Sequence, residues 1–542
     1  MRSSRLTSLV LLAGALTGGL VLEASEEPTP SPDVATPVEA GVAMPAADRP
    51  DTLSSTWYCA GGTATEGGFA DHVIILANPT AEDRTATVTV LTGDFAPAPA
   101  APAPETPPGE TTTTVAETTT TAPAVSTTTT VPPPTEPTSV ELPARSRVEV
   151  ALRDIVDAPL AGAVVEIDGG EVAVEHQITG EAFGRATAPC STTAAREWSF
   201  PWGVTLMGSR ELLVFMNPFP DDATIDIEFA TDEGTRETLR FTNFVVRGRS
   251  VVGAYIDEDV TRRGQVSAQV HVRSGRLVID RIQTFDGTDP AYEGITLGLG
   301  APTPAETWVF PDGQVDPGVT EQLVVFNPSE EVAEVEVEVR LDDPDVNGVP
   351  EPFELSIPPS RFSIVDLSEA DAEAVEGVPK RIPDGVGHSL IVRSLNGVPL
   401  AAERIITSSA PSAELGISAT LGSPLAAPTW LFPGGGVSAE REQYLTLYNA
   451  SPDEIARFSV AALVDGDTVA LDGLQDLEIP PGGRRAIRLR DHTELEELSL
   501  VVAADGPIVV ERGLYRVDGR GISQSMGIPL AVDVMVPDPV DG

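Results

Sequence analysis

Short runs in which apolar and polar residues alternate predict most of the secondary structure of this chain. Residues 225–229 and 335–339 alternate strictly, with Val, Ile or Phe at every second position. A period of two buries one face of a strand and exposes the other. The best helical candidate, residues 368–375, is short and acidic and fits a loop turn better. The pattern predicts an all-β protein with half-buried antiparallel sheets.

The same succession of strands occurs four times along the chain. Each unit opens with a tryptophan, and the asparagine that ends the next apolar strand follows 19 residues later, or 21 residues later in the first unit. We expect the tryptophan to pack its strand onto the core and the asparagine to shape a turn. Exposed tryptophans that stack on sugar are the alternative. The repeat positions are Trp57, Trp198, Trp308 and Trp430, with Asn78, Asn217, Asn327 and Asn449.

Later segments of the four units also match. An arginine precedes a further strand, and two final strands flank turns at 169–170, 274–275, 396–397 and 505–506. About seven short strands in roughly 100 to 110 residues are typical of an immunoglobulin-like sandwich. The sequence predicts a tandem array of four immunoglobulin-like β-sandwich modules, hereafter the first to fourth repeats, at 51–195, 196–304, 305–426 and 427–536, with a tail at 537–542.

The N-terminus has the features of an export signal. Arg2 and Arg5 precede an apolar stretch at 9–22, which is short for a membrane span. We expect a signal peptide or signal anchor at 1–24 and a flexible linker at 25–50. Because no second apolar span follows, the chain is expected to be extracellular or in the cell envelope, and to contact the membrane only through this segment if it stays uncleaved.

Residues 94–137 interrupt the first repeat with runs of Thr, Ala and Pro. Such a composition has too little apolar surface to bury and too much proline for a sheet, so we expect a disordered insertion. A glycosylated or wall-spanning spacer and a tolerated low-complexity expansion explain it equally well.

Charge excludes one class of partner. The chain has 82 acidic and 34 basic side chains and a net charge of −48, spread along its whole length. Such a surface repels nucleic acid and anionic lipid. A solvated or cation-binding surface fits better, and no nucleic-acid partner is expected.

Two cysteines, Cys59 and Cys190, are expected to form a disulfide bond, because an exported protein meets oxidising conditions. Cys59 stands where the other repeats have Phe200, Phe310 and Phe432. A redox function would normally show a closely spaced pair such as Cys-x-x-Cys, which is absent. The bond would make the first and last strands of the first repeat neighbours.

The final hairpin of each repeat carries an acid followed by a base. Neighbours on a strand point to opposite faces, so the two residues do not pair with each other. We expect each acid to meet the arginine that precedes the earlier strand of its own repeat, in a structural ion pair. The acid and base positions are Glu175-His176, Asp280-Arg281, Glu403-Arg404 and Glu511-Arg512, and the expected arginines are Arg147, Arg249, Arg361 and Arg485.

Residues 343–354 match the spacing of a calcium-binding loop, with oxygen ligands around a tight glycine turn. Three prolines and flanking strands in place of helices argue against it, and an acidic hairpin tip is the competing explanation. Calcium is the single cofactor that the sequence suggests. The candidate ligands are Asp343, Asp345, Asn347 and Glu354 through their side chains and Val349 through its carbonyl.

Catalytic motifs were sought without success. The five histidines are scattered singly, and no nucleophile elbow, phosphate-binding glycine loop or paired-cysteine zinc spacing occurs in the sequence. Abundant carboxylates leave a glycosidase-like pair open, but small sandwiches rarely provide the deep cleft that such a pair needs. We expect no enzymatic activity and name no catalytic residue.

Several short motifs carry a family resemblance. The Trp57-Tyr58-Cys59 opening, Asn-Pro at 78–79, 217–218 and 327–328, and Ala-Pro-Cys at 188–190 resemble a secreted actinobacterial family, domain of unknown function family 5719. The fourth repeat departs from it, with Asn449-Ala450 in place of Asn-Pro. The resemblance extends from Trp57 to about Ala531 and implies an exported, envelope-associated β protein. It implies no activity or catalytic residue.

These features favour a non-catalytic secreted or envelope-associated protein that serves as a structural, binding or spacer array. A protein that binds cell-wall polysaccharide through exposed aromatic residues is one alternative. A surface adhesion protein stiffened by calcium is the other. The expected partner is a cell-wall polymer or another envelope protein.

Overall fold

The computed structural model describes residues 40–98, 134–368, 381–517 and 519–537. Almost all regular structure there is β-strand, and the two α-helical segments in these ranges, α2 (Ala40–Ala43) and α3 (Pro344–Asn347), are single turns. The all-β, sandwich-type prediction is confirmed. Within the same ranges, no helix has the length and apolar character needed to cross a membrane. The predicted signal at 1–24 lies outside the described residues.

The third repeat shows the plan most simply. Its described part holds eight strands in two four-stranded sheets, one more strand than the sequence suggested. One sheet has the order β18-β23-β20-β21 and the other β22-β19-β24-β25. The strands are β18 (Thr307–Gly313), β19 (Val319–Asn327), β20 (Ala333–Leu341), β21 (Phe353–Ile357), β22 (Arg361–Asp366), β23 (His388–Ser394), β24 (Ala401–Ser408) and β25 (Gly416–Leu421).

The first two repeats follow this plan, and the parallel pairing of β14 with β3 joins one sheet of each into a single sheet. The first repeat has β1 (Ser55–Cys59), β2 (Asp71–Asn78), β3 (Arg84–Phe95), β4 (Thr138–Leu142), β5 (Ser146–Ala151), β6 (Leu160–Ile167), β7 (Ala173–Gly180) and β8 (Gly184–Pro189). The second has β9 (Glu197–Phe200), β10 (Ser209–Asn217), β11 (Ala223–Thr231), β12 (Gly234–Glu237), β13 (Phe244–Val246), β14 (Ser250–Tyr255), β15 (Val266–Ser274), β16 (Val278–Asp286) and β17 (Glu293–Leu299).

In the fourth repeat, one long strand, β32, takes the place of two strands of the plan and pairs with strands of both sheets. The strands are β26 (Ala427–Phe432), β27 (Arg441–Asn449), β28 (Ala456–Val464), β29 (Asp467–Ala470), β30 (Leu477–Ile479), β31 (Arg484–Arg488), β32 (Ser499–Arg516), β33 (Ile522–Met526) and β34 (Ile528–Pro529).

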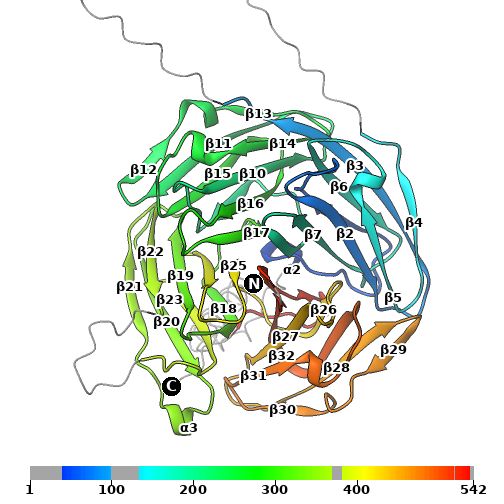
Figure 1. Ribbon diagram of the computed structural model, residues 1–542, viewed down its shortest axis with the longest axis vertical. Helices are drawn as coiled ribbons and strands as arrows, with labels where there is room; N and C mark the ends of the chain where they lie inside the picture. The colour runs from blue at the N-terminus through cyan, green and yellow to red at the C-terminus, as the bar shows by residue number, and fades with distance from the viewer. Residues whose placement is uncertain (1–39, 99–133, 369–380, 518, 538–542) are drawn as a thin grey trace, which may run out of the picture. The chain divides into compact units, whose positions relative to one another are not determined.

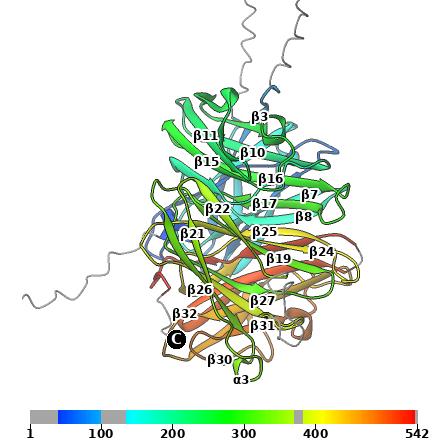
Figure 2. The ribbon, with the colours of Figure 1, turned by 90° about the vertical axis from the view of Figure 1, so that its left-hand side faces the viewer.

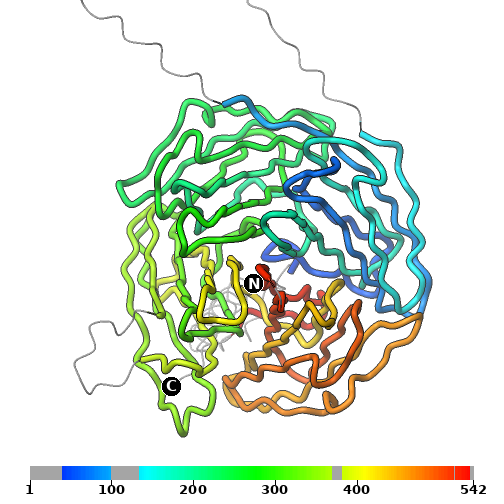
Figure 3. Tube along the Cα trace, viewed as in Figure 1, coloured from blue at the N-terminus to red at the C-terminus, as the bar shows by residue number. Residues whose placement is uncertain are grey.

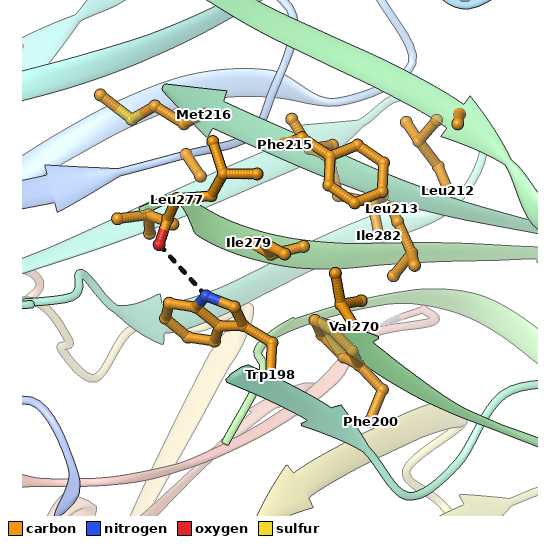
Figure 4. Packing of buried hydrophobic residues seen from close by; sticks show 14 of the residues in the cluster. Trp198, Phe200, Leu212, Leu213, Phe215, Met216, Val270, Leu277, Ile279 and Ile282 are labelled. Carbon is orange, nitrogen blue, oxygen red and sulfur yellow. Dashed lines mark hydrogen bonds between the residues drawn. The ribbon is translucent and has the colours of Figure 1, made fainter. Parts of the chain in front are cut away.

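Side-chain alternation places the cores as the sequence predicts. In β20, Val335, Val337 and Val339 are buried, and the glutamates between them are half-buried. The opening tryptophan of each repeat lies inside the sandwich. Figure 4 shows Trp198 packed against Leu277 and Ile279, with its indole N–H donating to the carbonyl of Leu277 at 3.1 Å. The bond satisfies the polar end of a fully buried ring.

A second aromatic position closes the end of each sandwich. Phe200, Phe310 and Phe432 lie against Gly300, Gly422 and Gly527, where an added Cβ would lie 2.6, 2.7 and 2.7 Å from the ring. Only glycine fits there. In the first repeat the matching pair is Cys59 and Cys190, which form the predicted disulfide bond between the sheet of β1 and the sheet of β8.

Residues 40–50 of the expected flexible linker, 25–50, contact the repeats, and residues 25–39 lie outside the described residues. Ala47 accepts a backbone hydrogen bond from Ala531 of the fourth repeat, and the sulfur of Met44 lies 3.3 Å from the hydroxyl of Ser423 in the third. Glu171 of the first repeat donates to Asp48. The segment therefore belongs to the folded unit that begins at Ala40.

The predicted disordered insertion, 94–137, is shorter than expected, because residues at both of its ends belong to the folded structure. β3 continues through Phe95, and Asp94 pairs with Val252 of the second repeat. Thr135 bonds to Val90 of the same strand. Most of the insertion, residues 99–133, and most of the predicted loop turn at 368–375 lie outside the described residues.

The repeats contact one another through their last strands. β8, β17, β25 and β33 touch in the closed order β8-β17-β25-β33-β8. Three of them run side by side in Figure 2, and the fourth repeat, orange to red, lies beside the first, blue to cyan, in Figures 1 and 3. Ala43, Met44 and Pro45 line a small cavity of about 70 Å³ together with residues of all four strands. Described residues from Ala40 onward form one compact unit.

The glycine opposite Phe310 offers a direct test of the packing. Changing Gly422 to Ala should lower the free energy of unfolding by about 1–3 kcal/mol, because the new methyl overlaps the ring. Gly264→Ala is the matched control, since nothing lies within 4 Å of its added Cβ. Urea unfolding followed by tryptophan fluorescence measures both. Equal effects of the two substitutions would contradict the packing.

Candidate functional site

The acid and base of the final hairpin link each repeat to both neighbours. Glu403 and Arg404 are adjacent on β24 and point to opposite faces, as the pleat requires. Glu403 accepts two bonds from Arg281 of the second repeat, one of them at 3.1 Å. Arg404 donates to Glu511 of the fourth repeat and, at 3.0 Å, to Gln524. One strand therefore binds a repeat on each side.

The links form a closed cycle of four joints. The fourth joint, between the fourth and first repeats, is a bidentate pair in which Arg512 donates to Glu175 at 3.2 and 3.1 Å. The first joint, between the first and second repeats, has His176 of β7 at 3.7 Å from Asp280 of β16. In order, the joints are His176 with Asp280, Arg281 with Glu403, Arg404 with Glu511, and Arg512 with Glu175.

Each joint acid also accepts a backbone N–H from the end of the first strand of the neighbouring repeat or from the residues just after it. All four acids are at most 3 % exposed, so these bonds replace the water that they lose. The donors are Ala60 to Asp280 at 3.1 Å, Trp202 to Glu403 at 3.1 Å, Asp312 to Glu511 at 3.0 Å, and Gly434 to Glu175 at 2.7 Å.

The prediction that the acids pair with Arg147, Arg249, Arg361 and Arg485 is wrong. Arg147, for example, binds Glu149 and Glu497 at the surface. The pleat correctly predicted that acid and base point apart. The pleat carries no information on which repeat lies beyond each face. In the second to fourth joints the two partners are 107 to 337 residues apart in the chain.

Burial shifts the proton equilibria in the joints. It raises the pKa of Asp280 to about 8, against the lowering effect of hydrogen bonds from Ala60 and Gly61. It lowers the pKa of His176 well below the usual value, and the charge of His72 adds to this. His72 itself is lowered to a pKa of about 4 by burial. At neutral pH the first joint therefore holds uncharged polar groups, linked by a 2.9 Å bond between the two imidazoles.

The second joint has an additional buried acid. Burial raises the pKa of Glu211 to about 8; Arg281 lowers it, and Asp257 and Glu403 raise it further. At the third joint, burial raises the pKa of Glu511 to about 7, although Arg404 lowers it. The fourth repeat carries Gln443 at the position of Glu211, and its amide oxygen accepts the N–H of Gly436. Three carboxyls in the joints thus hold protons near neutral pH.

The fourth joint contains a cavity. Its volume is about 370 Å³, and both repeats line it. Glu175 lies in its wall, bound to Arg512. Four further guanidinium groups line the same space: Arg185, Arg441, Arg516 and Arg520. Polar groups also line the cavity, from Ser438, Thr179 and Gln177.

The candidate calcium ligands are not gathered into a site. Residues 344–347 form the single turn α3, and the amide of Asn347 donates to the carbonyl of Asp342 at 2.6 Å. Glu354 lies in β21 and faces Glu336 across the ladder. Within the described residues, no three His, Cys, Asp or Glu side chains are placed to hold a metal ion. The residues concerned are Asp343, Asp345, Asn347, Val349 and Glu354.

The repeat tryptophans do not form a sugar-binding surface. Trp57, Trp198, Trp308 and Trp430 are at most 2 % exposed, so stacking of sugar on them is excluded. The repeat asparagines are equally buried and clamp turns. Asn327 donates to the carbonyls of Glu331 and Ile357 at 2.7 and 2.9 Å and accepts the N–H of Ser329. Asn78, Asn217 and Asn449 make the same set of bonds.

Part of the chain matches a protein family of unknown function. The family is DUF5719, and the match covers residues 169–376. This stretch begins in the first repeat and ends in the third, and it is less than half of the chain. The family description names no activity, so it assigns no role to the joints.

Other comparisons add little. No curated protein matches the sequence. Two solved structures, Thermotoga maritima 1070 and the Anabaena sensory rhodopsin transducer, are each 21% identical to the segments that they match. These segments cover 22% and 18% of this chain and 94% of each structure, with TM-scores of 0.18 and 0.14. Scores this low support no inference about fold or function.

Sequence reasoning missed the arginines of the fourth joint. A signal for them exists, because the repeats can be aligned on their own landmarks. Arg185 follows the glycine that opens the last strand, and the other repeats have Ile295, Ile417 and Ile522 there. A charged residue in a column of isoleucines marks a place where one repeat differs from the rest.

Removing one partner of a joint pair should destabilise the whole unit. Arg281→Met leaves Glu403 buried without its cation, and we expect the free energy of unfolding to fall by about 3–5 kcal/mol. Arg457→Met removes one partner of an exposed pair with Glu478 and should cost less than about 1 kcal/mol. The double change Arg281→Met with Glu403→Leu should recover most of the loss. Denaturant unfolding of the four proteins measures this, and a loss no greater than that of Arg457→Met would contradict the assignment.

The raised carboxyl pKa values predict a dependence of stability on pH. The folded chain keeps protons on Asp280 and Glu211 up to a pKa of about 8, and the unfolded chain releases them near pH 4. Stability therefore falls as pH rises toward 8, by about 1.4 kcal/mol per pH unit for each such carboxyl. The lowered pKa of His72 acts in the opposite sense, but only between about 4 and 6.5. We expect the unfolding free energy to decline from pH 6.5 to about 8 and then level off.

Glu211→Gln is the matched variant for this test, since the fourth repeat has Gln443 at that position. It should remove the contribution of one carboxyl and flatten the decline. Unfolding curves at several pH values measure both proteins. A stability that rises over this interval, or an identical slope in the variant, would contradict the protonation of these groups.

Proposed function

We propose that this chain is a non-catalytic, exported binding protein of the extracellular space or cell envelope, in which four repeats form one rigid scaffold. The closed cycle of joints carries the proposal. Each repeat is fixed to both neighbours by buried, hydrogen-bonded groups. Such a unit can present a binding surface of fixed shape. A spacer would instead need modules that move independently and so vary in reach.

The burial and hydrogen bonding of the joint carboxylates support a role without catalysis. A general acid or base must reach the proton that it transfers in a bound substrate. Glu403, Glu511 and Asp280 are instead enclosed between repeats. Glu175 lines the cavity of the fourth joint and Glu403 lines the smaller one, but Glu175 accepts bonds from Arg512 and from the N–H of Gly434, and Glu403 accepts bonds from Arg281 and from the N–H of Trp202. Among the described residues that line the cavity of the fourth joint, the other two carboxylates, Glu181 and Glu440, are exposed to solvent.

Two features support export. The N-terminal residues have the composition of an export signal, and the disulfide bond between Cys59 and Cys190 suits an oxidising compartment. In the first repeat this bond occupies the place that the Phe-Gly contact has in the other repeats. A protein kept in a reducing compartment would gain nothing from this exchange.

Binding to a cell-wall polymer is the form of this function that we favour. Stacking on the repeat tryptophans cannot supply it, since these rings are buried. A polar route remains, through the cavity of the fourth joint. Calcium-dependent adhesion has no comparable support, because the predicted ligands stand apart.

Co-sedimentation tests the proposal. The full chain, recovered from a host that exports it, is mixed with isolated cell-wall and membrane fractions, with calcium and with a chelator. We expect retention by wall material in both conditions. An Asp345→Asn variant serves as the control for the calcium loop and should be retained equally. Absence from both fractions would refute wall binding, and retention only with calcium would support the adhesion alternative instead.

A further inference from the structure

The fourth joint differs from the other three at three matching positions. The first position lies eight residues before the repeat asparagine, the second four residues after the joint base, and the third directly after the glycine that opens the last strand. At the fourth joint the three residues are Arg441, Arg516 and Arg185. At the first joint they are Ala70, Gly180 and Ile295, at the second Ser209, Phe285 and Ile417, and at the third Val319, Ser408 and Ile522.

The second joint shows what these positions do elsewhere. Phe285 and Ile417 belong to a buried apolar cluster that fills the space between the second and third repeats. The strand pairing confirms that the positions match, because Ser209 lies opposite Phe285 as Arg441 lies opposite Arg516. At the fourth joint the same space is lined by guanidinium groups and contains the cavity of about 370 Å³. Arginine side chains thus stand at the positions where the second joint has apolar contacts.

The described arginines of this cavity differ in their partners, and the exposed carboxylates of Glu181 and Glu440 line it as well. Arg520 is held by Glu293 of the second repeat, and Arg441 makes only long bonds of 3.5 Å to the carbonyls of Gly435 and Glu496. No carboxylate of the described residues lies within ion-pair distance of Arg185. Partial loss of solvent lowers the pKa of Arg185, although its side chain is still exposed; the charge of Arg441 lowers the pKa further, that of Glu149 raises it, and that of Arg516 lowers it least.

A strongly acidic chain makes this arrangement unusual. With 82 acidic and 34 basic side chains, most arginines on this protein can find a carboxylate nearby. Here guanidinium groups from β8, β27, the end of β32 and the loop after it line one cavity. The like charges of Arg185 and Arg441 repel each other, which costs free energy, and an anion placed between them would remove that cost.

We propose that the cavity of the fourth joint binds a small polar ligand through an anionic group, a carboxylate or a phosphate. Planar guanidinium groups bind both groups in bidentate fashion. The volume lies within the range of small-molecule sites and admits a ligand the size of a sugar acid or a sugar phosphate. Ser438, Thr179 and Gln177 supply hydrogen-bonding partners for its hydroxyl groups. The assignment rests on the proposed binding function and names the chemistry of its ligand.

Calorimetric titration of the full chain tests the site. The probes are glucuronate for the carboxylate, glycerol 3-phosphate and inorganic phosphate for the phosphate, and glucose as the neutral control. We expect saturable binding of glucuronate or of the phosphates and none of glucose. Whichever anion binds identifies the anionic group. Failure of all three anions to bind at millimolar concentration would overturn the proposal.

Arg185→Ile is the decisive variant, because three other joints carry isoleucine at this position and the change should be compatible with folding. It should weaken anion binding by about tenfold or more, the loss expected for one bidentate contact. Arg457→Gln, an exposed arginine outside the cavity, should leave binding unchanged. An unfolding curve confirms that each variant is folded. Equal affinity of Arg185→Ile and the unchanged chain would overturn the site.

Sedimentation of the same preparations with wall material separates this site from the proposed function. If the unchanged chain is retained and Arg185→Ile is not, the cavity is the wall-binding site. If both are retained and no anion binds in the titration, the site is wrong and the binding function stands. If the unchanged chain is not retained while the anions bind and Arg185→Ile does not bind them, the cavity is a ligand site and the wall-binding function is wrong.

Discussion

One strand in each repeat holds an acid on one face and a base on the other, and the repeats are fixed by this alternation. On β24, Glu403 reaches back to the second repeat and Arg404 reaches forward to the fourth. A buried ion pair adds little net stability over an apolar contact, but it is strongly directional and is costly to leave incomplete. Four such strands in a closed cycle determine which face of each repeat meets which neighbour.

The strands and the repeat positions could be predicted because their signals are local, and the disulfide bond because the chain has two cysteines to pair. Val335, Val337 and Val339 alternate within one strand, and Cys59 stands in a column of phenylalanines. The joint partners could not be predicted, since Arg512 and Glu175 are separated by most of the folded chain. The pleat says that a side chain points outward. It does not show that another repeat will pack against that side chain.

The exchange of Phe-Gly for Cys-Cys shows how an internal repeat can be used as an alignment. Phe200 requires Gly300, because any side chain at the glycine would overlap the ring. Cysteine at one position removes the ring and allows a Cβ at the other, so both must change together. The two positions are therefore in contact, and the sequence contains that information in four copies. The same comparison exposes Arg185 as a departure from the pattern.

The fourth joint is also the one that closes the cycle, and this explains why it can differ. The other joints connect repeats that follow one another in the chain, whereas the fourth brings together the first and last repeats. Its geometry is held by the bidentate pair of Arg512 and Glu175, by the N–H of Gly434, and by the bonds of Ala47 to the end of the fourth repeat. With the closure secured by these groups, the outer part of the joint does not need an apolar seal. Residues there are free to serve a ligand.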